Sequence, residues 1–110
     1  MIQIFGVKNC NDTKKAIRFF KDRKINIQFI NLKEKEISKG ELKSITKIFD
    51  IDELLDRESK EFKKRNLEYY IFDTLELLME SPTLFKTPIL RKKDKVTLGY
   101  CPEKWKTWAK

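Results

Sequence analysis

The 110-residue sequence contains no histidine, and this absence removes several kinds of chemistry at once. Histidine is the commonest general base, the usual partner of a catalytic cysteine and the commonest metal ligand in proteins. Two cysteines without any histidine argue against a zinc site. We therefore expect neither a histidine-based active site nor a bound metal.

Cysteine, glycine and proline are also scarce, with two, three and three residues respectively. A chain of this length can bury a hydrophobic core without cross-links, so the fold need not depend on a disulfide. We find no apolar stretch long enough to cross a membrane and no signal-peptide pattern. The sequence therefore predicts one cytoplasmic domain, residues 1–110, whose cysteines stay reduced unless they take part in redox chemistry.

Charge, in contrast, is abundant. Lysine and arginine together number 25 against 17 aspartates and glutamates, which gives a formal net charge of +8. Such a balance favours solubility and attracts acidic partners. The lysines are spread along the whole chain, however, and no nucleic-acid recognition motif accompanies them. We expect no direct binding to nucleic acid and no contact with a membrane.

Hydrophobic spacing predicts a strand–helix–strand unit in the first 32 residues. Residues 1–5 form the apolar run MIQIF, typical of a buried strand, and residues 25–32 largely alternate apolar and polar side chains. The helix between them has apolar residues on one face: Ala16, Ile17 and Phe20. Three polar residues could cap it: Asn11, Asp12 and Thr13. The two strands of such a unit are expected to be parallel.

The middle of the chain, about residues 38–80, predicts a mainly helical segment. Ser38 and Glu41 have the spacing of a capping box, which opens a helix. Residues 58–65 and 69–80 also have helical spacing, and Pro82 ends the second of these stretches.

The C-terminal part predicts a β-hairpin followed by a helix. Residues 87–90 and 95–99 are short strands separated by RKKD, a spacing that suits antiparallel pairing. Pro102 suits the first turn of a last helix. Together the elements predict an α/β protein with a thioredoxin-like fold: a four-stranded mixed sheet with an all-helical insertion between its halves.

Cys10, in the stretch VKNCNDTKKA, is the residue best placed to do chemistry. It lies just before the first helix, where unpaired backbone N–H groups and the helix dipole stabilise negative charge. Lys14 could add positive charge from the first turn. Because the thiolate is the nucleophilic form of cysteine, this position predicts reactivity. The alternative is an inert buried cysteine, against which the polar neighbours argue.

Cys10 lacks the nearby partner of dithiol redox proteins, because Thr13 stands at the second cysteine position of a CxxC motif. A monothiol mechanism needs an external small thiol such as glutathione, or a distant cysteine. Cys101, just before Pro102, is the candidate resolving thiol; alternatively it is a boundary residue without chemistry. We expect no bound cofactor.

Three stretches resemble the arsenate reductase-like ArsC/Spx/YffB family, and its YffB-like branch most. GVKNCNDTKKA is similar to the active-site loop of that family, LMESPTLFKTPIL to the segment before its characteristic proline, and TLGYCPEKW to its last strand and closing helix. The resemblance implies a thioredoxin fold with a helical insertion and a catalytic-type cysteine at Cys10. It also implies that the Thr87–Pro88 bond is cis and that its loop faces Cys10.

The sequence departs from the family where arsenate reductases hold their oxyanion. Lys14, Thr87 and Cys101 stand where arginines are expected, and Arg57 is one position away from a fourth, at Glu58. A lysine cannot supply the paired hydrogen bonds of a planar guanidinium. These departures argue against true arsenate reduction.

The sequence therefore predicts a site in which Cys10 and Lys14 are catalytic. Six further residues are expected to bind substrate: Asn11, Asp12, Thr13, Arg57, Thr87 and Pro88. The leading functional hypothesis is a thiol oxidoreductase that reacts with a small thiol or an oxidised substrate. One alternative is an Spx-like regulator that contacts RNA polymerase, and another is a fold that has lost its chemistry. The missing CxxC switch favours the first.

Overall fold

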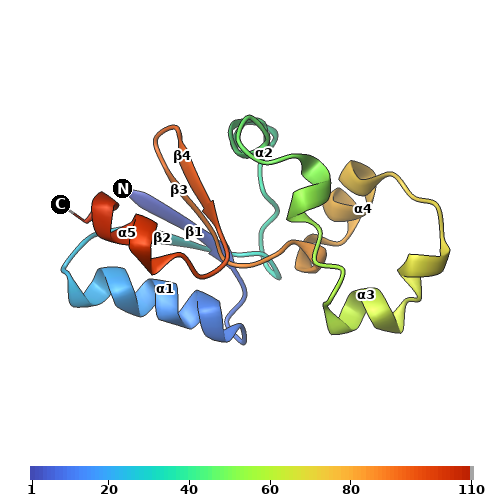
Figure 1. Ribbon diagram of the computed structural model, residues 1–110, viewed down its shortest axis with the longest axis horizontal. Coiled ribbons are helices and arrows are strands. Elements are labelled where there is room, and N and C mark those ends of the chain that lie inside the picture. Colours follow the sequence, from blue (N-terminus) through green and yellow to red (C-terminus); the bar gives the residue numbers. More distant parts are fainter. Residues whose placement is uncertain (110) are drawn as a thin grey trace.

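The computed structural model describes residues 1–109 and shows a four-stranded sheet with helices on both faces (Figure 1). The strand order is β2-β1-β3-β4. The strands are β1 (Ile2–Gly6), β2 (Ile27–Asn31), β3 (Ile89–Lys92) and β4 (Lys95–Leu98). β1 pairs in parallel with β2, whereas β3 is antiparallel to both β1 and β4. The predicted mixed sheet is thereby confirmed.

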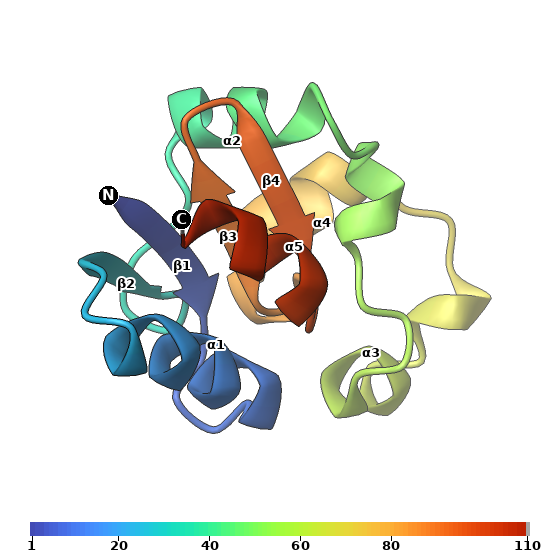
Figure 2. The ribbon, with the colours of Figure 1, turned by 60° about the vertical axis from the view of Figure 1, so that its left-hand side comes forward.

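Two helices cover one face of the sheet and the insertion covers the other, as Figures 1 and 2 show from two directions. The α-helices are α1 (Asn11–Asp22), α2 (Lys39–Thr46), α3 (Lys60–Lys64), α4 (Thr74–Glu80) and α5 (Pro102–Trp108). Short 3₁₀ turns lie in and after the insertion: η1 (Ile51–Leu54), η2 (Leu67–Tyr69) and η3 (Pro82–Leu84). Within residues 1–109 no helix has the length and apolar character needed to cross a membrane.

The predicted helix over residues 69–80 is wrong in its first half. Residues 70–73 lie outside any helix, and α4 begins only after Asp73, whose carboxylate accepts a hydrogen bond from the Glu76 N–H at 3.0 Å. An aspartate at this position satisfies a free N–H group and fixes the helix start. Helical spacing of apolar residues therefore extended the prediction past a capping residue.

The hairpin is also tighter than the sequence suggested. β3 begins at Ile89 and continues to Lys92, so two residues, Lys93 and Asp94, form the turn. Lys93 has a φ of 56°, which matches the left-handed backbone of tight hairpin turns.

Alternation along β1 divides the interior into two cores, because neighbouring strand residues point to opposite faces. Ile2 and Ile4 face α1 and α5, whereas Phe5 faces the insertion. The core under α1 and α5 has seven buried members: Ile2, Ile4, Ala16, Phe20, Leu90, Trp105 and Trp108. Trp105 is fully buried there, and its indole N–H donates to Thr97 Oγ1 at 2.9 Å.

A short antiparallel bridge between Leu55 and Phe85 closes residues 56–84, called the outer insertion below, into a loop. The Asp56 N–H donates to the Leu84 carbonyl at 2.8 Å, and the Lys86 N–H donates to the Leu54 carbonyl at 2.7 Å. The bridge therefore ends one residue before Thr87, at the start of the loop that the sequence assigned to the site.

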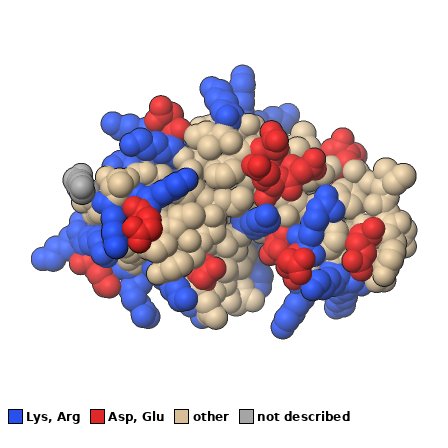
Figure 3. All heavy atoms as spheres, in the orientation of Figure 1, with Lys and Arg blue, Asp and Glu red and all other residues tan. Residues whose placement is uncertain are grey.

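Basic side chains on the face drawn in Figure 3 are not collected in one area. Lysine and arginine lie at several separate places on this face, with aspartate and glutamate among them. This agrees with the even spread of lysine along the sequence.

Candidate functional site

Cys10 occupies the N-cap position of α1. Its backbone is extended, with φ −85° and ψ 120°, and its carbonyl accepts a hydrogen bond from the Lys14 N–H at 3.1 Å. The predicted caps Asn11, Asp12 and Thr13 are wrong, because all three lie inside the first turn and no side chain caps the helix. The sulfur therefore stands where a capping oxygen usually stands, beside the free N–H groups of the helix start.

Thr87 reaches Cys10 from the other end of the chain. Its hydroxyl lies 3.3 Å from Cys10 Sγ and donates to it, while the thiol can donate to the Thr87 carbonyl at 3.9 Å. The sheet explains this meeting, because Phe5 in β1 pairs with Ile89 in β3. Because the two strands are antiparallel, the loop after β1 and the loop before β3 lie at the same end of the sheet. The Thr87–Pro88 bond is cis, as the resemblance implied, and its loop does face Cys10.

The pKa of the Cys10 thiol is set by burial and hydrogen bonding acting in opposite directions. Partial burial raises this pKa, because it disfavours the charged form. Four donors lower it by more: the hydroxyls of Thr13 and Thr87 and the backbone N–H groups of Thr13 and Asp12. The net result is a pKa below the ordinary value for cysteine. All four donors are neutral groups.

Thr13 lies close to Cys10, and its side chain fills the space beside Gly6, which has no side chain of its own. The Thr13 side chain is fully buried. A Cβ built on Gly6 would lie 2.5 Å from Thr13 Oγ1 and 2.7 Å from Thr13 Cγ2, so only glycine leaves room for it. Because the side chain is fully buried, it faces the sulfur rather than solvent, and the substrate contact that the sequence suggested for Thr13 remains a prediction. No sequence pattern linked Gly6 to the site.

Cys101 stands at the start of α5 as a half-buried thiol. Its Sγ donates to the Leu98 carbonyl at 3.3 Å, and its side chain packs against the core under α5. Neither cysteine is in a disulfide. Lys15 Nζ in α1 lies 5.2 Å from the ring centroid of Tyr100, so a side chain of α1 reaches the residue next to Cys101. The resolving role of Cys101 remains a prediction.

The remaining predicted site residues are either exposed to solvent or in contact with residues other than Cys10. Lys14 is exposed on α1, and Asn11 is exposed at its start. Asp12 pairs with Lys15 at 4.0 Å. The Arg57 guanidinium lies 5.7 Å from the rings of both Phe62 and Phe72, inside the insertion. Across residues 1–109 no group of three or more aspartates, glutamates or cysteines is placed to hold a metal ion.

Comparison with known proteins agrees with this geometry. Residues 5–108 match the sequence profile of the ArsC family. The chain belongs to the ArsC family. The resemblance found in the sequence, to the ArsC, Spx and YffB proteins, is thereby confirmed.

Two curated relatives of this ArsC-family chain have names of regulators. Global transcriptional regulator Spx 2 of Oceanobacillus iheyensis is 33% identical over 104 residues, which cover 90% of this chain and 76% of the relative. Regulatory protein MgsR of Bacillus subtilis is 31% identical over 106 residues, which cover 92% and 84%.

Solved structures show that the ArsC-family fold is thioredoxin-like, as predicted. A YffB protein superposes with a TM-score of 0.83 at 22% identity, with 97% of each chain covered. An ArsC-related protein from Brucella melitensis has a TM-score of 0.69 at 26% identity and covers 99% of this chain and 94% of its own. A glutaredoxin from Archaeoglobus fulgidus has a TM-score of 0.50 at 20% identity, covering 96% and 82%.

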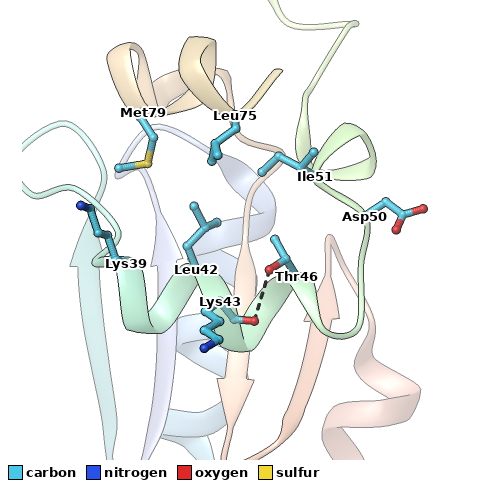
Figure 4. A pocket seen from close by; sticks show the side chains of 8 residues that line it. All are labelled: Lys39, Leu42, Lys43, Thr46, Asp50, Ile51, Leu75 and Met79. Atoms are coloured by element: carbon cyan, nitrogen blue, oxygen red, sulfur yellow. Dashed lines mark hydrogen bonds between the residues drawn. The ribbon is translucent and has the colours of Figure 1, made fainter. Parts of the chain in front are cut away.

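This ArsC-family chain also carries an apolar groove of about 530 Å³ on the insertion (Figure 4). α2, η1 and α4 supply its lining: Lys39, Leu42, Lys43, Thr46, Asp50, Ile51, Leu75 and Met79. Leu42 and Leu75 point toward one another across it, and the two lysines lie one helical turn apart on α2. None of the residues that touch Cys10 lines this groove.

Proposed function

We propose that this ArsC-family protein is a monothiol oxidoreductase in which Cys10 exchanges disulfides, with glutathione or a similar small thiol as co-substrate. The supporting observation is the set of four neutral donors around one partly exposed sulfur. A thiol with a lowered pKa is ionised in a larger fraction at neutral pH, and the thiolate is the attacking species.

The reaction follows thiol–disulfide exchange. The Cys10 thiolate attacks one sulfur of a disulfide; the new bond to Cys10 forms as the old S–S bond breaks, and the second sulfur leaves as a thiolate that takes up a proton. An external thiolate then attacks the sulfur attached to Cys10 and regenerates the Cys10 thiolate. That attack forms a new disulfide between the external sulfur and the transferred sulfur, so one disulfide is exchanged for another and the cycle needs no bound cofactor.

The protein's part in each step is to hold charge on the Cys10 sulfur. The hydroxyl of Thr87 and the N–H groups of Asp12 and Thr13 stabilise the thiolate before attack and again when it leaves. Stabilising the leaving thiolate speeds release of the adduct. We do not propose arsenate as a substrate, because Lys14 and Thr87 cannot bind an oxyanion through the paired hydrogen bonds that an arginine forms.

The test is turnover of a glutathione mixed disulfide with glutathione and glutathione reductase. Cys10→Ser should abolish turnover, because serine cannot form the adduct. Cys101→Ser should retain the wild-type rate when external thiol resolves the adduct, and should lose most of it when Cys101 does. Because the pKa of Cys10 is lowered, the rate should reach its plateau at a lower pH than a free cysteine would give. Undiminished turnover in Cys10→Ser would refute the proposal.

The second candidate function is that of an Spx-like regulator that binds RNA polymerase. Two relatives more than 30% identical, Spx 2 and MgsR, have names of regulators, and the net charge of +8 suits an acidic partner. We expect the contact at the apolar groove, because Leu75 is 46% exposed there and Lys39 and Lys43 border it.

Purified RNA polymerase provides the test of this second function. Binding should survive Cys10→Ser but fall at least about tenfold in Leu75→Glu, because a carboxylate would be desolvated in the contact and would repel an acidic partner. Tyr70→Glu is the matched control, since Tyr70 is 65% exposed on the same insertion but outside the groove. Equal loss in both variants, or no binding by the wild type, would argue against this function.

A further inference from the structure

We infer that Thr13 is a positioning residue whose buried hydroxyl donates a hydrogen bond to the Cys10 sulfur when that sulfur is ionised. The inference deepens the proposed function and rests on it, since disulfide exchange is what makes a thiolate at Cys10 useful. It concerns one atom, Thr13 Oγ1, and what that atom can bind.

Thr13 and Thr97 are the two buried polar residues within residues 1–109, and they differ in one respect. Thr97 Oγ1 accepts a hydrogen bond from the indole of Trp105 at 2.9 Å. Thr13 Oγ1 makes no hydrogen bond of standard geometry in the described part of the chain, although it lies near enough to the Cys10 sulfur to help lower its pKa. A buried hydroxyl without a partner destabilises a fold, so its presence calls for an explanation.

The Thr13 side chain cannot turn to find another partner. It is branched at Cβ, so few rotamers are open to it. Gly6 packs directly against it, with Oγ1 and Cγ2 in the space that a Cβ on Gly6 would occupy. Thr13 is three residues after the N-cap Cys10, which places the two side chains on the same side of the first turn.

The Cys10 sulfur is therefore the acceptor to which the Thr13 hydroxyl can donate. A neutral thiol is only a weak acceptor, whereas hydrogen bonds to a charged group are much stronger. The interaction thus gains strength when Cys10 ionises, and the lowered pKa of Cys10 is consistent with this. Threonine at the second CxxC position stabilises the thiolate as a donor but cannot form a disulfide with it.

The test is a pH titration of the Cys10 thiolate, followed by ultraviolet absorbance in a Cys101→Ser background so that one thiol is observed. Thr13→Val, which replaces the hydroxyl by a methyl group of similar size, should raise the pKa of Cys10 by about one unit, a tenfold lower thiolate-to-thiol ratio at a given pH. Thr13→Ser should restore most of the wild-type pKa, because it restores the donor.

Thr97→Val is the matched control, because it removes the hydroxyl of the other buried threonine. It should lower the thermal midpoint of unfolding, since the Trp105 indole loses its acceptor, and leave the pKa of Cys10 unchanged. At a pH low enough to keep Cys10 protonated, Thr13→Val should do the reverse: its midpoint should stay equal or rise, because an unpartnered hydroxyl is removed. At a pH where Cys10 is ionised the midpoint should fall, because the thiolate loses a donor. This opposite pattern would not arise if Thr13 were merely structural.

The inference is overturned by an unchanged pKa of Cys10 in Thr13→Val, or by a rise in Thr13→Ser as large as that in Thr13→Val. Circular dichroism should confirm that each variant is folded; if Thr13→Val is not, Thr13→Ala provides the same test. Because the titration uses no substrate, a failed glutathione assay would refute the proposed function while leaving this result intact, and a failed titration would do the opposite.

Discussion

Gly6→Ala is expected to lower the free energy of unfolding by about 1–3 kcal/mol, the usual range for overpacking a core. The added Cβ would meet Thr13 Oγ1 at 2.5 Å and Thr13 Cγ2 at 2.7 Å, distances that force a shift. Thr13 cannot yield easily, because it is buried in the first turn of α1. Any shift of that turn also moves the donors around Cys10, so the pKa of Cys10 should rise. Urea unfolding and thiolate titration measure the two effects.

A second substitution separates the steric effect from the electronic one. Combining Gly6→Ala with Thr13→Ala removes both clashing atoms and leaves Thr13 Cβ at 3.2 Å. The double variant should regain most of the lost stability while the pKa of Cys10 stays high. Gly40→Ala is the matched control: Gly40 lies in α2 with nothing within 4 Å of its ideal Cβ. That change should stabilise by roughly 0.5–1 kcal/mol through helix propensity. Simple additivity of Gly6→Ala and Thr13→Ala would contradict the packing argument.

Trp105→Ala is expected to destabilise the fold most, by about 3–5 kcal/mol, as for other buried aromatic residues. The ring is fully buried between the sheet and α1, with edge contacts to Phe19 and Tyr100 at centroid distances of 5.6 Å each. Its loss leaves a cavity and removes the partner of Thr97 Oγ1. The midpoint of urea unfolding should fall sharply.

Tyr100→Ala is the comparison for Trp105→Ala. Tyr100 is 52% exposed, so its removal opens no enclosed cavity and should alter stability by less than about 1.5 kcal/mol, the upper end for an aromatic pair. Similar losses in the two variants would show that the core under α5 does not depend on Trp105 in the way its burial indicates.

Local patterns were enough to predict most of the elements. The capping box at Ser38 and Glu41 is present in full, with both reciprocal hydrogen bonds formed. Pro102 opens α5, and the strand–helix–strand unit at the start has parallel strands. Each of these features depends on residues a few positions apart, so periodicity and capping rules could detect it.

The helix predicted over residues 69–80 is wrong where its apolar residues lie at the surface instead of in a core. Tyr69, Tyr70 and Ile71 have exposed fractions of 79%, 65% and 105%, yet helical spacing placed them within a packed helix. A pattern rule assumes that apolar side chains face the interior, and this segment does not follow it. Asp73, which caps α4, was the signal that could have corrected the prediction.

The candidate site was predictable only in part, because its contacts join distant residues. Cys10 could be identified from its place before a helix. Its contact with Thr87, 77 residues away, required the family resemblance. The packing of Gly6 on Thr13 had no sequence signal, since it depends on how a strand end and a helix turn meet in space.

The bridge between Leu55 and Phe85 bears on how freely this protein can evolve. Its two hydrogen bonds, at 2.8 and 2.7 Å, join backbone atoms only, so they do not depend on which side chains are present. They fix the chain just before Thr87, while β3 fixes it just after Pro88. The outer insertion can therefore change its surface, and with it any partner, through many substitutions while the reactive sulfur keeps the same neighbour.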